Sequence, residues 1–129
     1  MTQSYKPQGY TSVAPYLIVD GASETIAFLQ HVFGAEELRR YTSTDGKVRH
    51  AEVRIDDTVV MLADAVEGWP STQAHVHVYV EDVGATYQRA LEAGAASVQA
   101  PVRKDDEDKR GGFTDASGIT WWIATKVGT

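Results

Sequence analysis

The sequence predicts an α+β fold in which two βαβββ modules form one curved, barrel-like mixed sheet. Three observations support this prediction. The same order of strand-like and helix-like segments occurs twice, each helical segment ends at a glycine, and turn residues separate the strand-like runs that follow. The chain has 129 residues, of which 43% are apolar, and this supplies core for one domain but not for two independent ones. We therefore expect a single domain over 1–129, with module 1 at 13–66 and module 2 at 74–126.

Module 1 begins with a strand-like run at 16–20 and continues into a helix over 22–33. Apolar residues recur along this helix at helical spacing, namely Ala22, Ile26, Leu29 and Phe33. Gly34 stands where a left-handed cap would end the helix, because glycine has no Cβ to oppose positive φ. Three further strands are expected, at 37–42, 47–55 and 58–63, with a hairpin turn at Asp45-Gly46.

Module 2 repeats this order after a connector at 67–73. A strand-like run at 76–82 precedes a second amphipathic helix, which ends at Gly94. Strands are expected at 97–102, 112–114 and 119–125. The intervening segment 103–112 has the sequence RKDDEDKRGG, and this dense mixed charge favours a solvated loop over a binding site.

Alternation along the strands predicts which side chains share a face of the sheet. The set expected to pack against the helices is Ala51, Val53, Ile55, Val76, Val78, Val80, Ile119, Trp121 and Ile123. The opposite set is polar and aromatic, and consists of His50, Glu52, Arg54, His75, His77, Tyr79, Thr120, Trp122 and Ala124. A second face of this composition fits either the lining of a ligand cavity or an ordinary solvated face, and periodicity alone leaves both open.

Composition argues against several classes of function. With 12 Lys and Arg against 18 Asp and Glu, the net charge is −6, so we expect no nucleic-acid partner. No apolar run approaches the roughly 18 residues of a membrane span, and the polar start of the chain has no secretory pattern, so we expect a cytoplasmic protein that does not enter a membrane. The absence of cysteine excludes disulfides and thiolate chemistry.

Four segments carry a resemblance to a known family. They are F-x-x-x-x-F-G-A-E at 28–36, G-K-x-x-H-A-E-x-x-I at 46–55, V-E-D-V at 80–83 and D-x-x-G-x-x-W at 115–121. In this order they resemble the vicinal-oxygen-chelate superfamily of glyoxalase, bleomycin-resistance and extradiol-dioxygenase proteins, and more narrowly its PhnB-type branch, found beside phosphonate-utilisation genes. The resemblance implies the glyoxalase/bleomycin-resistance fold of paired βαβββ modules. It also implies a homodimer, with modules paired either within one chain or across two.

Metal-dependent members of that superfamily bind a divalent ion through two histidines and two glutamates. The resemblance places those four positions on Ala14, Met61, His75 and Trp122. Only His75 keeps the usual ligand, because alanine and tryptophan offer no lone pair and a thioether suits soft metals. We therefore expect no metal and no other cofactor.

The leading functional hypothesis is a binding protein that sequesters a small aromatic or amphipathic ligand, with antibiotics among the candidates. Aromatic rings on a rigid sheet stack on planar molecules at little entropic cost. The candidate ligand-binding residues are Tyr16, His50, Glu52, Met61, Trp69, His75, His77, Tyr79 and Trp122. Among these, Trp69 lies on the connector, where it could act as a lid.

The competing hypothesis is an enzyme, for which no catalytic residue is assigned. His50, His75, His77 and Glu52 could form a relocated metal site of a lyase, isomerase or dioxygenase. The same histidines with Glu52 could instead catalyse acid–base chemistry without a metal. The sequence leaves both forms of this alternative open.

Overall fold

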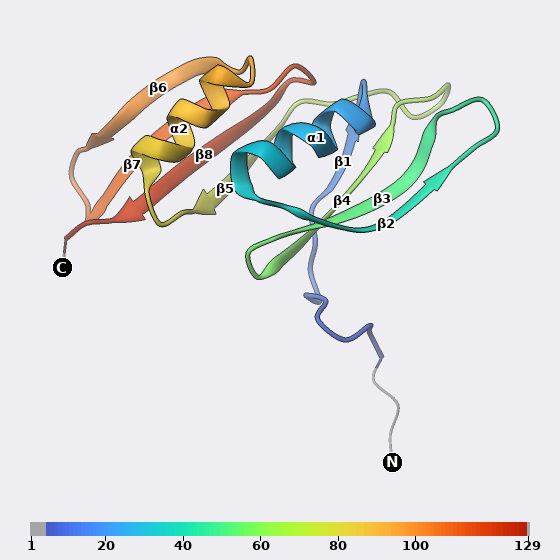
Figure 1. Ribbon diagram of the computed structural model, residues 1–129, viewed down its shortest axis with the longest axis horizontal. Coiled ribbons are helices and arrows are strands. Elements are labelled where there is room, and N and C mark those ends of the chain that lie inside the picture. The colour runs from blue at the N-terminus through green and yellow to red at the C-terminus, as the bar shows by residue number, and fades with distance from the viewer. Residues whose placement is uncertain (1–4, 129) are drawn as a thin grey trace.

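The computed structural model describes residues 5–128 and contains two four-stranded mixed sheets with both helices on one side of them (Figure 1). The first sheet and its helix comprise β1 (Tyr16–Val19), α1 (Ala22–Phe33), β2 (Glu36–Thr42), β3 (Val48–Ile55) and β4 (Thr58–Asp64). Its strand order is β1-β4-β3-β2, in which only the β1–β4 pair is parallel. This is the expected βαβββ arrangement.

The second sheet repeats that topology. It comprises β5 (Ala74–Tyr79), α2 (Val83–Glu92), β6 (Ala96–Arg103), β7 (Asp108–Thr114) and β8 (Ile119–Lys126), with strand order β5-β8-β7-β6. Again the first strand is parallel to the last. Within residues 5–128, neither helix is long and apolar enough to cross a membrane. The α+β class and the module topology are therefore confirmed.

The two sheets do not join into the single barrel-like sheet that the sequence predicts. The strands β1 and β5 are edge strands of separate sheets. The β1 carbonyl of Ile18 points away from β4 and accepts a hydrogen bond of 3.3 Å from the amide of Thr72, in the connector between the modules. Backbone of the connector thus occupies part of the free edge of β1.

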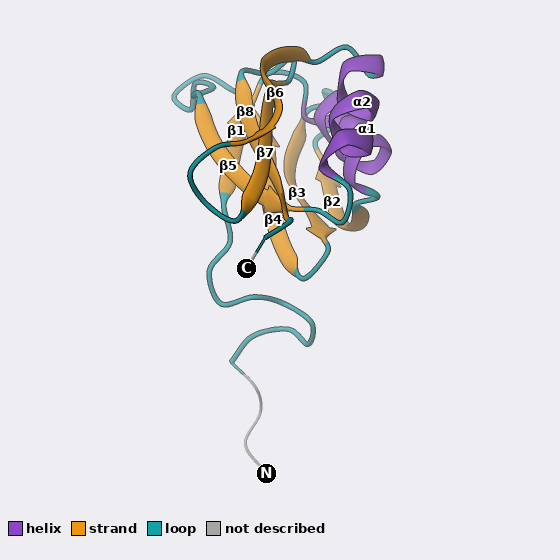
Figure 2. Ribbon diagram, turned by 90° about the vertical axis from the view of Figure 1, so that its left-hand side faces the viewer, coloured by secondary structure: helices purple, strands orange, loops and turns teal. Residues whose placement is uncertain are grey.

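Both helices cover the same face of the sheets, as the side view shows (Figure 2). The core between helices and sheets is continuous across the two modules. Phe33 of α1 lies 5.5 Å from Trp121 of β8 and 6.3 Å from Phe113 of β7, measured between ring centroids. Because a helix of module 1 packs on the sheet of module 2, the two modules share one core.

The glycines that follow the helices act as expected, and a side chain caps the start of the second helix. Gly34 has φ of 66° and its amide donates to the carbonyl of Gln30, which closes α1 in the left-handed conformation. Gly94, just beyond the end of α2, has φ of 97°. Asp82 caps the start of α2 by accepting a hydrogen bond from the amide of Ala85. These contacts fix the direction in which the following strands leave.

Candidate functional site

The face of each sheet opposite the helices carries the predicted polar and aromatic side chains. On the first sheet these are Tyr16, His50, Glu52 and Met61, and on the second they are His75, His77, Tyr79 and Trp122. The alternation in β8 follows the expectation, because Trp121 and Ile123 are fully buried whereas Trp122 is partly exposed. The nine predicted residues therefore fall into two groups, with Trp69 of the connector beside the first.

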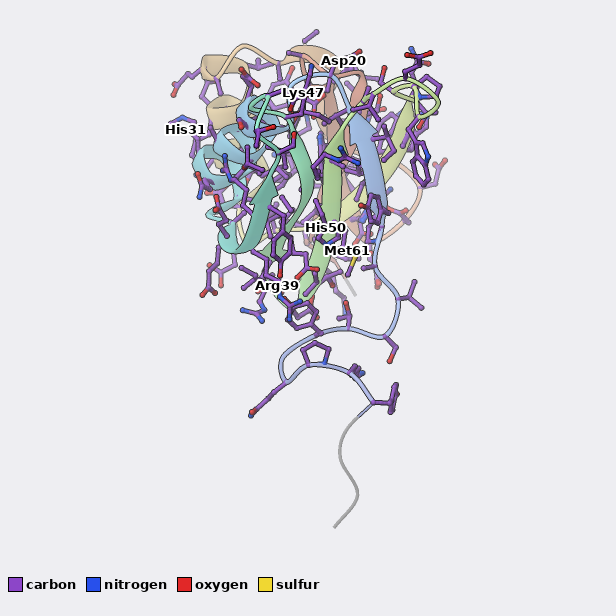
Figure 3. All side chains as sticks on the ribbon, turned by 90° about the vertical axis from the view of Figure 1, so that its right-hand side faces the viewer. Asp20, His31, Arg39, Lys47, His50 and Met61 are labelled. Carbon is purple, nitrogen blue, oxygen red and sulfur yellow. The ribbon has the colours of Figure 1, made fainter. Side chains whose placement is uncertain are left out.

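Glu52 is the centre of the first group. Register places it beside Met61 of β4 and Arg39 of β2 on one row across the sheet, and Figure 3 labels His50, Met61 and Arg39 on this side of the molecule. The Glu52 carboxylate accepts hydrogen bonds from the hydroxyl of Tyr10 at 2.5 Å and from Nε2 of His50 at 2.7 Å. Nε of Arg39 lies 3.5 Å from the same carboxylate.

These contacts keep Glu52 ionised although it is only 4% exposed. Burial works against the charged carboxylate, but the hydrogen bonds from Tyr10 and His50 and the charge of Arg39 outweigh it, so the pKa of Glu52 lies below its ordinary value. The same hydrogen bond raises the pKa of the Tyr10 hydroxyl, which donates to a carboxylate. Neither Tyr10 nor Arg39 could be recognised from the sequence as a partner of Glu52, because neither lies near Glu52 in the chain.

The ionised carboxylate fixes the tautomer of His50. Nε2 must carry a proton to donate to Glu52, so in the neutral imidazole Nδ1 is an acceptor. The hydroxyl of Tyr16 lies 2.9 Å from that Nδ1 and donates to it. Tyr16, His50 and Glu52 thus form a continuous hydrogen-bonded chain from a half-exposed phenol to a buried carboxylate.

Tyr16 also borders a small cavity of about 170 Å³. Its lining is Tyr16, Ile18, Arg49, Ala63, Asp64, Val66 and Trp69. Trp69 is exposed and is tied to Val66 by two backbone hydrogen bonds of 2.9 and 3.1 Å. The candidate lid residue therefore lies beside one of the candidate wall residues.

Trp122 is the main feature of the second group. A Cβ built on Gly112, its neighbour on β7, would lie 2.6 Å from the indole ring, so the ring lies directly over the glycine backbone. The indole N–H donates to Nδ1 of His75 at 3.0 Å, and the two rings are almost parallel, at 11° with centroids 6.3 Å apart. Together they form an aromatic surface on β5 and β8.

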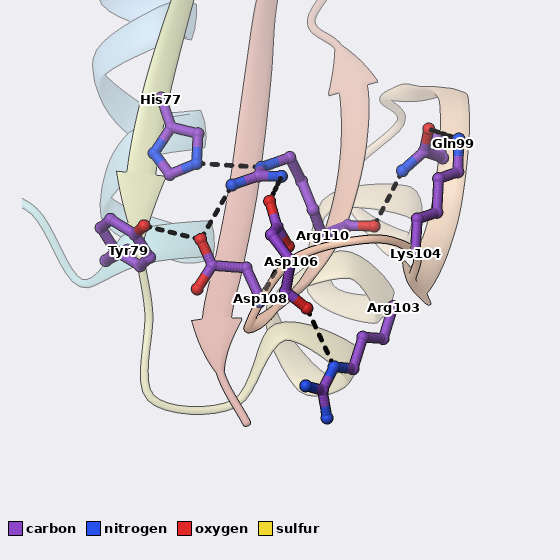
Figure 4. Close-up of polar contacts among 8 residues, drawn as sticks. All are labelled: His77, Tyr79, Gln99, Arg103, Lys104, Asp106, Asp108 and Arg110. Atoms are coloured by element: carbon purple, nitrogen blue, oxygen red, sulfur yellow. Dashed lines mark hydrogen bonds and ion pairs between the residues drawn. The ribbon is translucent and has the colours of Figure 1, made fainter. Parts of the chain in front are cut away.

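A charged network completes the second group (Figure 4). Nε of Arg110 donates to Nε2 of His77 at 3.2 Å, and its Nη2 donates to Asp108 at 2.9 Å. The Tyr79 hydroxyl donates to the same Asp108 oxygen at 2.6 Å, which raises the pKa of Tyr79. Burial, together with the charge of Arg110, lowers the pKa of His77. Asp108 is buried, and its other oxygen accepts no hydrogen bond from any residue of 5–128.

The interpretation of 103–112 as a solvated loop is wrong. The strand β6 ends at Arg103 and β7 begins at Asp108, so only residues 104–107 lie between them. Asp108, Arg110 and Gly112 alternate on the face that carries Trp122 and His77. The charges that favoured a loop in the sequence instead pair with one another beside two of the predicted residues.

The residues at the superfamily's metal positions do not fit a divalent ion. Of Ala14, Met61, His75 and Trp122, only His75 offers a suitable ligand atom, and its Nδ1 accepts the indole N–H of Trp122. The relocated set is not assembled either, since His50 and Glu52 lie on the first sheet and the other two histidines on the second. Within residues 5–128, no three His, Cys, Asp or Glu residues are grouped so that they could hold a metal.

Comparison with known proteins gives a consistent assignment. The sequence model described as "Glyoxalase/Bleomycin resistance protein/Dioxygenase superfamily" matches residues 9–123. The chain is 37% identical over 127 residues to uncharacterized protein Mb0911c of Mycobacterium bovis, covering 90% of this chain and 84% of that protein.

Two solved structures illustrate the similarity of fold. TioX from Micromonospora sp. ML1 has a TM-score of 0.71 at 24% identity, covering 89% of this chain and 99% of that one. TnmS3 from Streptomyces sp. CB03234, described as an antibiotic binding protein, has a TM-score of 0.68 at 18% identity, covering 91% of this chain and 99% of that one. At these identities the similarity concerns the fold.

Proposed function

Because the chain belongs to the glyoxalase/bleomycin resistance protein/dioxygenase superfamily, we propose that it is a small-molecule-binding protein that sequesters an aromatic or amphipathic ligand on the outward faces of its two sheets. The observation that carries this proposal is the position of Trp122, whose ring lies over Gly112 and beside His75. A planar ligand can stack on such a surface while few side chains lose rotamer freedom. That TnmS3 binds an antibiotic makes planar antibiotics the first class of ligand to test.

We propose further that this binding uses no metal. Support comes from the residues at the superfamily's metal-ligand positions. The indole of Trp122 and the thioether of Met61 replace ligand groups there, and Nδ1 of His75 accepts the indole N–H. The ligand would then be held by stacking and by hydrogen bonds from side chains such as those of Tyr16, His77 and Tyr79. Affinity should be unaffected by chelators.

Two copies of the chain would form the complete binding protein in this proposal. The cavity of about 170 Å³ is lined by Tyr16 of the first group and by Trp69 beside it. Another cavity of about 340 Å³ is lined by the turn between β3 and β4 and by β5, including His77 and Tyr79 of the second group. A homodimer that faces one sheet against the partner's other sheet would bring both groups to one ligand. Light scattering after size exclusion should give twice the 14.1 kDa mass of the chain, and a single-chain mass would contradict the dimer.

We propose further that the chain belongs to the PhnB-type branch and that it is cytoplasmic. The PhnB-type branch is supported by the four ordered segments, from F-x-x-x-x-F-G-A-E to D-x-x-G-x-x-W. Neither assignment changes the ligand class expected at Trp122.

The direct test is a tryptophan fluorescence titration against a panel of planar aromatic antibiotics. Trp121 is fully buried and Trp69 lies on the connector, so stacking at Trp122 should give saturable quenching that the Trp69→Phe variant retains. The Trp122→Ala variant should lose this response and its affinity. A panel that quenches neither the wild type nor the Trp69→Phe variant would contradict the proposal.

A further inference from the structure

Tyr16, His50 and Glu52 have the connectivity of a reactive hydroxyl, a base and an orienting carboxylate. The Tyr16 hydroxyl donates to Nδ1 of His50 at 2.9 Å, and Nε2 of His50 donates to Glu52 at 2.7 Å. This is the order of contacts that activates a hydroxyl in catalytic triads. The carboxylate end is held firmly, because Glu52 is buried and also accepts the hydroxyl of Tyr10.

The direction of proton movement follows from the acceptors. Glu52 is ionised, so Nε2 of His50 keeps its proton and the lone pair of Nδ1 faces the Tyr16 hydroxyl. When the Tyr16 proton passes to Nδ1, the imidazolium that forms lies 2.7 Å from a carboxylate, which stabilises it by a charge-assisted hydrogen bond. Arg39 lies beside Glu52 on its other side and keeps the carboxylate charged.

Tyr79 is a second hydrogen-bonded tyrosine, but its hydroxyl does not donate to a histidine. Tyr16 is 47% exposed and Tyr79 is 60% exposed, so a reagent can reach both. Tyr79 donates to the carboxylate of Asp108, and a carboxylate is a far weaker base than imidazole. The pKa of Tyr79 is raised by that bond. Tyr79 is therefore a matched control within the same molecule.

The cavity beside Tyr16 provides room and charge for a substrate. Ile18, Ala63 and Trp69 supply apolar walls. The carboxylate of Asp64 also lines the cavity, but it accepts the backbone amides of Ala22 and Val48. The remaining charged side chain of the lining is Arg49. Its guanidinium is permanently positive and can stabilise an anion formed there. The volume of about 170 Å³ is below the ~300 Å³ typical of cavities for drug-sized ligands, which restricts the substrate to a small molecule.

We propose that Tyr16 is a catalytic residue for proton transfer, acting on small, largely apolar carbon acids such as enolisable ketones. The substrate α-proton moves to the Tyr16 oxygen as the Tyr16 proton moves to Nδ1 of His50, which leaves an enolate beside Arg49 and an imidazolium beside Glu52. Return of a proton by the same route to another atom of the enolate completes an isomerisation and needs no cofactor. Glu52 is a positioning residue. This activity does not depend on ligand stacking at Trp122.

The first test measures the activation of Tyr16 with an aryl sulfonyl fluoride, 4-nitrobenzenesulfonyl fluoride. The Tyr16 oxygen attacks sulfur, fluoride leaves and His50 takes the proton. On the full chain, peptide mass spectrometry should give a labelling rate for Tyr16 at least about 10-fold above that for Tyr79. This ratio is set below the factor of ~10²–10⁴ that a positioned base contributes in an enzyme. Equal rates, or no labelling of either residue, would overturn the proposal.

Variants separate activation from a structural effect. The His50→Gln variant should lower the Tyr16 rate to that of Tyr79, whose own rate should stay constant and so report an intact second sheet. In a His50→Gly variant, added imidazole should restore Tyr16 labelling, which a purely structural role of His50 would not allow. If the ratio of Tyr16 to Tyr79 labelling is unchanged in His50→Gln, His50 is not the base and the proposal fails.

The second test measures proton transfer itself. We expect the chain to accelerate exchange of the α-hydrogens of 2-indanone in D₂O, followed by NMR, and the Tyr16→Phe variant to abolish that acceleration. Exchange that is not accelerated, or that is equally fast in Tyr16→Phe, would overturn the assigned activity. The exchange experiment tests only the activity of Tyr16, whereas antibiotic quenching tests binding at Trp122. Failure of one proposal can therefore be distinguished from failure of the other.

Discussion

The indole of Trp122 and the backbone of Gly112 are in direct contact across the β7–β8 pair, with no room for a side chain between them. A Cβ on Gly112 would lie 2.6 and 2.8 Å from two atoms of the indole ring. The glycine therefore determines where the ring lies, and the ring determines the shape of the second sheet's outward face.

Gly112→Ala should displace the indole and weaken ligand binding. The new methyl group cannot share the space of the ring, and such overpacking costs about 1–3 kcal/mol in the free energy of unfolding. Urea unfolding and the fluorescence titration should change together. Gly84→Ala is the control, because its Cβ would meet only a side-chain oxygen at 3.6 Å in a helix, and it should stabilise the protein by up to about 1 kcal/mol. Unchanged quenching in Gly112→Ala would place the ligand elsewhere.

Asp115→Ala should be among the most destabilising single changes in the chain. The buried carboxylate accepts hydrogen bonds from the amides of Ser117 and Ile119 and from the indole N–H of Trp121, at 2.9, 3.1 and 2.9 Å respectively. Each buried donor left without an acceptor costs about 1–3 kcal/mol. Thermal or urea unfolding measures the loss.

Asp105→Ala is the matched control for Asp115, since Asp105 is an exposed carboxylate in the loop 104–107. Its free energy of unfolding should stay within about 0.5 kcal/mol of wild type. Equal effects of the two variants would mean that the hairpin does not depend on the Asp115 hydrogen bonds.

Glu52 should contribute a pH-dependent part of the stability. Its pKa is lowered in the folded chain, so its contribution is present above the unfolded-state value of about 4.3 and is lost as the pH falls through the lower folded-state value. Wild type should therefore lose more stability than Glu52→Gln between about pH 6 and pH 3. The two can be compared by urea unfolding at each pH.

Tyr10→Phe is the control for that pH dependence. It removes one hydrogen bond to Glu52 but leaves the carboxylate, His50 and Arg39 in place. We expect an acid sensitivity between those of wild type and Glu52→Gln. Identical pH profiles for wild type and Glu52→Gln would show that Glu52 titrates alike in the folded and unfolded chains.

Phe113→Ala should loosen the junction of the two modules. Its ring is fully buried, lies 5.9 Å from Phe28 and 6.3 Å from Phe33 of α1, and sits on the sheet of the other module. Removal of a buried phenylalanine ring costs about 3–5 kcal/mol in the free energy of unfolding.

Since the modules share a core, wild type should unfold in one urea transition that fluorescence and circular dichroism report equally. Two separate transitions in wild type would contradict the shared core.

Much of the fold could be predicted from local patterns. The glycines at 34 and 94 adopt positive φ after the helices, and alternation in β8 correctly separated buried Trp121 from partly exposed Trp122. The separation of the two sheets could not be predicted this way. At the free edge of β1 the carbonyl of Ile18 accepts the amide of Thr72, and backbone contacts of a connector leave no periodic signal.

The candidate site was harder to predict for two physical reasons. Tyr10 and Arg39 reach Glu52 only through strand register and the course of the N-terminal segment, so no short-range spacing reveals them. Asp108 and Arg110 lie in a run of charges typical of solvated loops, yet they pair with each other on a strand. Composition shows that these charges are present, but it does not show that neighbouring charged side chains pair with one another.

The most direct test of the binding proposal is calorimetric titration of a quenching ligand with metal-free protein. Wild type in EDTA should bind with the same affinity as wild type supplied with Zn²⁺, Ni²⁺, Mn²⁺ or Fe²⁺, and Trp122→Ala should bind at least about 10-fold more weakly, the equivalent of 1.4 kcal/mol. Binding that requires one of these ions, or that survives unchanged in Trp122→Ala, would contradict a metal-free aromatic site on the second sheet.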